Sequence, residues 1–83
     1  MEYLKLLSQK ISDTEEHVTA IEPIRISGRK TILGYRLAKR RIVDRNGYSF
    51  DYGYIGQAKD VYLPKKTLSV DWQVARQLLG IID

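Results

Sequence analysis

The sequence predicts an α+β fold, in which a small antiparallel meander of three to four strands is flanked by an N-terminal and a C-terminal helix. Three observations carry this prediction: apolar residues at helical spacing near the start, alternating β-rich segments in the middle, and a capped apolar segment at the end. The chain has 83 residues. A chain of this length has room for one hydrophobic core, so residues 1–83 are expected to form a single compact domain.

The first element is predicted from Leu4, Leu7 and Ile11, which recur at helical spacing. They indicate a short amphipathic helix over residues 2–11. The helical series continues weakly as far as Pro23, which would end it. The intervening segment HVTAIEPIRIS is nevertheless rich in β-branched residues, so a strand over residues 17–27 is favoured.

The middle of the chain reads as strands separated by turns. SGRK (27–30) and DRNG (44–47) carry turn residues, and the segment 31–43 between them alternates in character. Its odd positions at the start are expected to face the core, namely Leu33, Tyr35 and Leu37, with Arg36 and Arg40 on the other face. A returning strand over 48–55 and a short strand over 59–64 follow, the latter ending at Pro64.

The last element is a helix. Ser69 is expected to be its N-cap, Asp71 to suit the positive end of its dipole, and Gly80 to follow its C-terminus. The apolar face is formed by Ala75, Leu78, Leu79 and Ile82, joined by Trp72.

Alternate positions of the 48–55 strand hold four aromatic residues that must share one face: Tyr48, Phe50, Tyr52 and Tyr54. A two-residue turn at Asn46-Gly47 places them with the inward leucines, as part of the core. A three-residue loop instead places them with Arg36 and Arg40, as a solvent-facing surface on which bases could stack. The turn residues fit either loop. Burial of about 1.5–3 kcal/mol per side chain favours the core alternative.

Charge is distributed unevenly along the chain. Residues 23–45 contain eight bases and one acid, whereas the whole chain carries a net charge of +4. Such a segment suits a polyanion. The expected nucleic-acid-binding residues are Arg29, Lys30, Arg36, Lys39, Arg40, Arg41 and Arg45, with Tyr52 and Tyr54 at the edge of the site. Strand alternation divides the bases between two faces, which weakens this expectation.

Enzymatic signals are close to absent. The chain has no cysteine and one histidine, His17, so disulfides and Cys/His metal sites are excluded and no catalytic residue or cofactor is expected. The amino terminus does not have the pattern of a signal peptide, and no apolar run approaches the roughly 20 residues of a membrane span. The expected location is therefore cytoplasmic, without membrane contact.

The function predicted from these features is binding of a polyanion, most simply DNA or RNA, through an arginine-rich β-hairpin that contacts phosphates. The alternative is a protein-binding adaptor or inhibitor of the phage or plasmid type, docking through the apolar C-terminal segment LLGIID. Homodimerisation is a further expectation, because so small a core leaves a thin margin of stability. Neither the choice between DNA and RNA nor the oligomeric state follows from the sequence.

Overall fold

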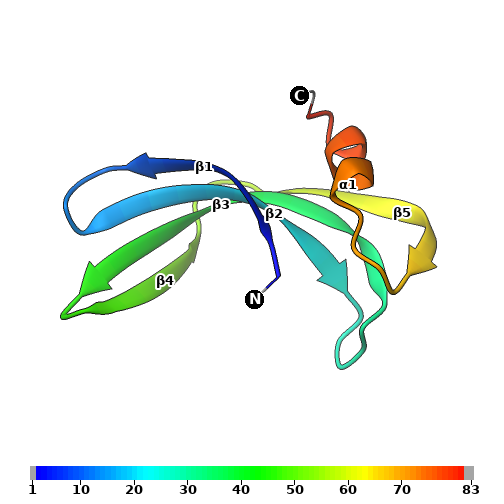
Figure 1. Ribbon diagram of the computed structural model, residues 1–83, viewed down its shortest axis with the longest axis horizontal. Helices are drawn as coiled ribbons and strands as arrows, with labels where there is room; N and C mark the ends of the chain where they lie inside the picture. Colours follow the sequence, from blue (N-terminus) through cyan, green and yellow to red (C-terminus); the bar gives the residue numbers. More distant parts are fainter. Residues whose placement is uncertain (1, 82–83) are drawn as a thin grey trace.

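The computed structural model describes residues 2–81 as a curved antiparallel sheet with one short helix (Figure 1). The strands are β1 (Leu4–Lys10), β2 (Glu15–Arg25), β3 (Ile32–Arg45), β4 (Tyr48–Tyr54) and β5 (Lys59–Thr67), and the helix is α1 (Trp72–Leu78). The meander and the C-terminal helix are therefore confirmed, with five strands among the described residues instead of three to four. Pro64 lies inside β5 and does not end it.

The long strand β3 organises the sheet. It has 14 residues and pairs with β2 along one edge. Along its other edge it pairs first with β5 and then with β4, so these two strands share one side of β3. β1 pairs with β2 and completes the sheet. The result is an elongated molecule with extents of 42 × 31 × 19 Å.

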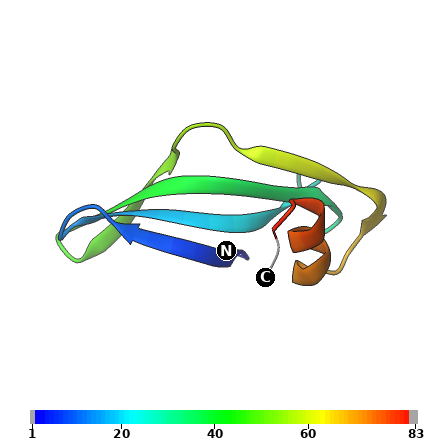
Figure 2. The same cartoon turned by 90° about the horizontal axis from the view of Figure 1, so that it is seen from above.

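The core lies at one end of this sheet. Helix α1 packs on one face, called here the helix face, and the opposite side is the open face. The central cluster of buried side chains comprises Ile21, Ile32, Tyr35, Ala75 and Leu79. Figure 2 shows that α1 covers only the end of the sheet near β5, while β4 and the paired ends of β1 and β2 extend away from it. The far end of the sheet is thus a single layer.

The N-terminal helix predicted for residues 2–11 is wrong: this segment contains strand β1. A register shift between Lys5 and Leu7 breaks the alternation along the strand. Leu4 and Leu6 both pack against the core, and Leu7 is 59% exposed. The bulge replaces a clean period of two by an irregular apolar spacing, which in the sequence imitates a helix.

Helix α1 begins two residues later than Ser69 would place it. Asp71 is the N-cap, and its carboxylate accepts hydrogen bonds from the backbone N–H groups of Gln73 and Val74. The N–H of Asp71 itself donates to the hydroxyl of the buried Tyr35 at 2.9 Å. Gly80 follows the helix with a φ of 76°, as expected for a residue that ends it.

The β3–β4 connection is a two-residue turn at Asn46-Gly47, both with positive φ (51° and 81°). Arg45 is therefore opposite Tyr48, and Val43 is opposite Phe50. Of the two loops considered from the sequence, this is the one that was expected to place the aromatics in the core. The register then shifts, so that Tyr54 lies opposite Arg40, on the open face. Gly53, with a φ of 93°, provides this bulge.

The expectation that the β4 aromatics are mainly core is wrong. Tyr48, Phe50 and Tyr52 lie on the helix face but are 70%, 46% and 50% exposed, and Tyr54 is 42% exposed. The β3–β4 register is the one expected for aromatics in the core, but helix α1, the layer that would bury these rings, does not extend over them. An inward-facing register buries a side chain only where a second layer covers the sheet.

Candidate nucleic-acid interface

The basic side chains of β3 are divided between the two faces of the sheet. Lys39, Arg41 and Arg45 alternate with Arg36 and Arg40, so that the two sets point to opposite sides. Arg29 and Lys30 belong to neither set, because they lie in the turn between β2 and β3. That turn is at the opposite end of the molecule from the β3–β4 turn (Figure 1). The residues expected from the sequence to form one site therefore occupy three places.

On the open face, acidic side chains already engage both arginines. Arg36 forms a bidentate contact with Asp60, with N···O distances of 2.7 and 2.8 Å. Arg40 donates to Glu22 at 3.2 Å and to Asp51 at 3.1 Å. Tyr54 joins the network: its hydroxyl donates to Glu22 and accepts hydrogen bonds from both guanidinium groups. A phosphate at this position would have to displace carboxylates from well-formed charged hydrogen bonds.

The Arg36–Asp60 contact has a consequence for pH. The hydrogen bonds from Arg36 lower the pKa of Asp60 below its ordinary value of 3.8. The ionised carboxylate therefore stabilises the fold above this value, and the stabilisation is lost as the pH falls through the lowered pKa. We expect Asp60→Asn to be less stable than the wild type at neutral pH, with a difference that shrinks below about pH 4.

Urea unfolding at several pH values tests this expectation. Asp13→Asn is the matched control, since Asp13 forms no ion pair within residues 2–81. A destabilisation by Asp60→Asn that stays constant from neutral to acidic pH would contradict a role for the ionised form.

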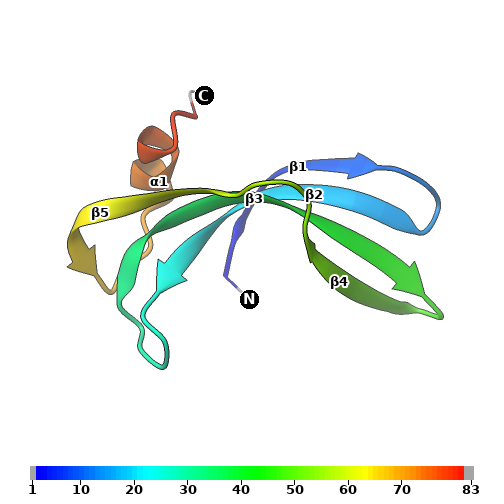
Figure 3. The ribbon, with the colours of Figure 1, turned by 180° about the vertical axis from the view of Figure 1, so that it is seen from behind.

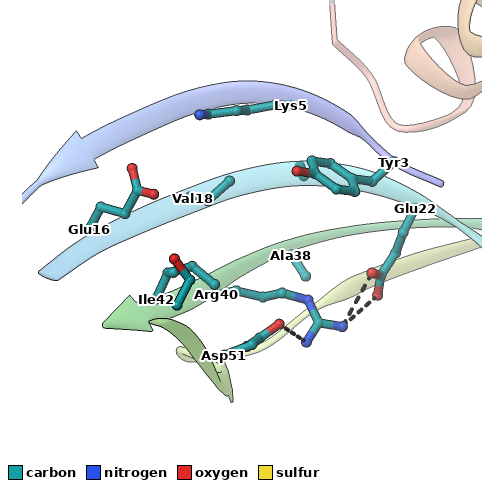
Figure 4. Close-up of a pocket in the computed structure, with 11 residues that line it drawn as sticks. Tyr3, Lys5, Glu16, Val18, Glu22, Ala38, Arg40, Ile42 and Asp51 are labelled. Atoms are coloured by element: carbon teal, nitrogen blue, oxygen red, sulfur yellow. Dashed lines mark hydrogen bonds and ion pairs between the residues drawn. The ribbon is translucent and has the colours of Figure 1, made fainter. Parts of the chain in front are cut away.

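The same network borders a groove on the open face, with a volume of about 370 Å³. Small apolar side chains from β2 and β3 form its floor, among them Val18, Ala20 and Ala38. Figure 4 shows the Arg40 guanidinium at its rim, held between Glu22 and Asp51. The polar groups of the rim satisfy one another, which makes this side of the sheet a poor surface for a polyanion.

At the far end of the helix face the situation is different. Lys39, Arg41 and Arg45 share this face with the exposed rings of Tyr48, Phe50 and Tyr52, and these six residues are called here the aromatic patch. The guanidinium carbons of Arg41 and Arg45 lie 5.1 and 5.7 Å from the centre of the Tyr52 ring, within cation–π range. No ion pair holds Lys39 or Arg45 within the part of the chain that the structure describes.

One acid counters the positive charge of the patch in part. Glu15 accepts a hydrogen bond from Arg41 at 3.1 Å and another contact from His17 at 3.0 Å. These contacts, that of Arg41 first, lower the pKa of Glu15. The Arg41 side chain nevertheless remains 44% exposed, so its outer edge stays accessible to a ligand.

Sequence reasoning missed Tyr48 and Phe50 as site residues and did not identify the acidic partners of Arg36 and Arg40. The two rings were assigned to the core because the sequence does not show how much of the sheet α1 covers. Glu22 and Asp60 meet the arginines through cross-strand pairing, with Arg36 lying opposite both. Only the register of β2 and β5 against β3 could have revealed them.

The C-terminal segment considered as a docking surface is largely used by the fold itself. Leu79 is buried, and Leu78 and Ile81 pack against the core cluster. Leu68, in the loop before α1, is 71% exposed. Ile82 lies outside the described residues.

The described residues contain no helix that is long and apolar enough to cross a membrane. They also contain no cluster of three or more histidine or acidic side chains that could hold a metal ion. No protein-family model matches the chain, and it shows no significant similarity to a curated protein or to a solved structure.

Proposed function

We propose that this protein binds single-stranded nucleic acid on the aromatic patch. The observation that carries the proposal is the exposure of three rings on one strand, on the face that carries Arg41, Arg45 and Lys39 and away from the acids of the open face. Aromatic rings on a sheet surface stack with the nucleobases of single strands, while neighbouring arginine and lysine side chains hold the phosphates. Bases in a duplex are already stacked on one another, so a single strand is the form that these rings can engage.

The spacing of the rings supports this arrangement. Tyr48, Phe50 and Tyr52 are alternate residues of β4, so their positions along the strand differ by about 6.8 Å per step. Exposed apolar surface of this extent brings no benefit to the isolated fold, because burying each ring would contribute about 1.5–3 kcal/mol. A partner that covers the rings would recover that free energy on binding.

Fluorescence titration of a labelled single-stranded oligonucleotide tests the proposal. The double variant Tyr48→Ala/Tyr52→Ala should weaken binding by about 1–3 kcal/mol for each base stacked. Arg41→Ala/Arg45→Ala should reduce the slope of log K against log salt by roughly 1.4, the contribution of two phosphates on a single strand.

Arg29→Ala/Lys30→Ala is the matched control. It removes the same charge from the distant turn and should leave the salt slope nearly unchanged. Equal weakening by the two double charge variants would show that net charge alone is responsible, and no binding at ~50 mM salt would contradict the function itself.

A further inference from the structure

We infer that two copies of this chain pair antiparallel through the free edges of their β4 strands, with Phe50 opposite Phe50 of the second copy. The inference rests on the edge of β4 and not on the proposed nucleic-acid function. Figure 3 shows β4 at the margin of the sheet, with no other strand of residues 2–81 beyond it. Such an edge offers unpaired backbone donors and acceptors to another strand.

Of the three edge strands among the described residues, β4 carries the least protection, and its bulge at Gly53 lies at the end remote from the β3–β4 turn. β1 carries Lys5 and Lys10 and a bulge, and β5 contains Pro64, Lys65 and Lys66. Lysine, proline and bulges on an edge oppose pairing with a second sheet. β4 (YSFDYGY) has neither lysine nor proline. Its one charge, on Asp51, is neutralised within the chain by Arg40 at 3.1 Å.

The two-residue turn determines which groups face the free edge. Residues that flank such a turn form a hydrogen-bonded pair, and the pairs alternate along the hairpin. Tyr48 and Phe50 therefore direct their backbone groups toward β3, while Ser49 and Asp51 direct theirs outward. A partner strand must use these two outward residues.

Three two-fold registers use the outward residues, and one of them is self-complementary. Pairing Asp51 with its own copy puts Tyr48 opposite Tyr54, whose ring lies on the open face, so Tyr48 has no opposite ring on the helix face. Pairing Ser49 with its own copy leaves Tyr52 without an opposite ring. Pairing Ser49 with Asp51 of the second copy opposes Phe50 to Phe50 and Tyr48 to Tyr52, and all three aromatic positions then have an aromatic neighbour.

In this dimer the two aromatic patches become continuous across the two-fold axis. The pairing is edge to edge, so the rings remain on the surface of the helix face and the second copy contributes its own Arg41 and Arg45 to the same strip. The dimer therefore extends the aromatic patch without covering it.

Disulfide cross-linking tests the register, because the chain has no cysteine of its own. Phe50 occupies a non-hydrogen-bonded position with a Cα–Cα separation of about 4.5 Å to its counterpart, within disulfide range. Phe50→Cys should therefore convert to a covalent dimer in a glutathione redox buffer. Tyr48→Cys and Tyr52→Cys should each stay monomeric alone, since like cysteines would be roughly 13 Å apart along the strands, and should cross-link when mixed.

Equal cross-linking of all three single variants would indicate random collision and overturn the inference, as would a Phe50→Cys protein that stays monomeric. Sedimentation equilibrium of the unmodified protein provides an independent arm, with a dimer expected. Ser49→Pro removes an outward N–H that β3 does not use, and it should shift the equilibrium to the monomer. These measurements contain no nucleic acid, so their outcome is independent of the oligonucleotide titration.

Discussion

Tyr35→Ala is expected to lower the free energy of unfolding by about 3–5 kcal/mol, the largest loss for any side chain of the sheet. Tyr35 is 1% exposed and sits at the centre of the core, with its ring 6.1 Å from that of Trp72. Its hydroxyl also accepts the N–H of Asp71, the residue that caps α1. Truncation therefore removes the packing between sheet and helix, and it also removes the hydrogen bond that holds the N-terminal end of α1.

Tyr35→Phe separates the two contributions. The ring stays, but the Asp71 N–H loses its acceptor, and a loss of about 1–3 kcal/mol is expected. Urea unfolding, followed by the fluorescence of Trp72, gives the free energy of unfolding of both variants. Trp72 is the single tryptophan and lies beside Tyr35, so its signal reports on the altered region. If Tyr35→Phe were as stable as the wild type, the hydrogen bond to Asp71 would have no role in holding the helix on the sheet.

Gly34→Ala is expected to destabilise the protein by roughly 3 kcal/mol, the upper range for an overpacked position. A Cβ at this position would lie 2.2 Å from the carbonyl oxygen of Val61 and 2.7 Å from the Cα of Tyr62. Both atoms belong to the backbone of β5, so no side-chain rotation can relieve the overlap. The β3–β5 pairing would have to open or shift.

Gly28→Ala is the control for this substitution. Gly28 has a φ of 73° and open space around the position of a Cβ, so alanine there carries only the backbone penalty of about 1–2 kcal/mol. The two variants, compared by thermal or urea unfolding, should rank with Gly34→Ala as the less stable. The reverse order would mean that backbone conformation, and not the close approach of β5, determines the tolerance to alanine.

The sequence predicted the meander, both of its turns and the C-terminal helix because these features depend on local chemistry. The residues of SGRK and DRNG favour turns through local chemistry, although they left the length of the second loop open, and Gly80 ends a helix for a similarly local reason. The N-terminal strand was mistaken for a helix because its bulge is a product of pairing with β2. Seven residues are too few for periodicity to distinguish the two structures.

The candidate site was predictable only in its composition. The sequence contained the arginines and the tyrosines, and alternation already indicated that the bases would separate. The position of Tyr54 depended on the bulge at Gly53, which moves this ring to the open face beside Arg36 and Arg40. Whether an arginine is available to a ligand depended on Glu22 and Asp60, which reach it from other strands.

The restriction of α1 to one end of the sheet also divides the molecule in its internal stability. Around Ile21, Ile32 and Tyr35, opening the sheet requires exposure of the core, so that part unfolds only with the whole protein. At the far end no second layer covers the sheet, so the edge strand β4 can open in a local fluctuation of lower free energy, while β3 stays paired with β2. The molecule thus has a stable end around α1 and a less stable end at β4, and the two ends are expected to differ in how readily their backbone hydrogen bonds open.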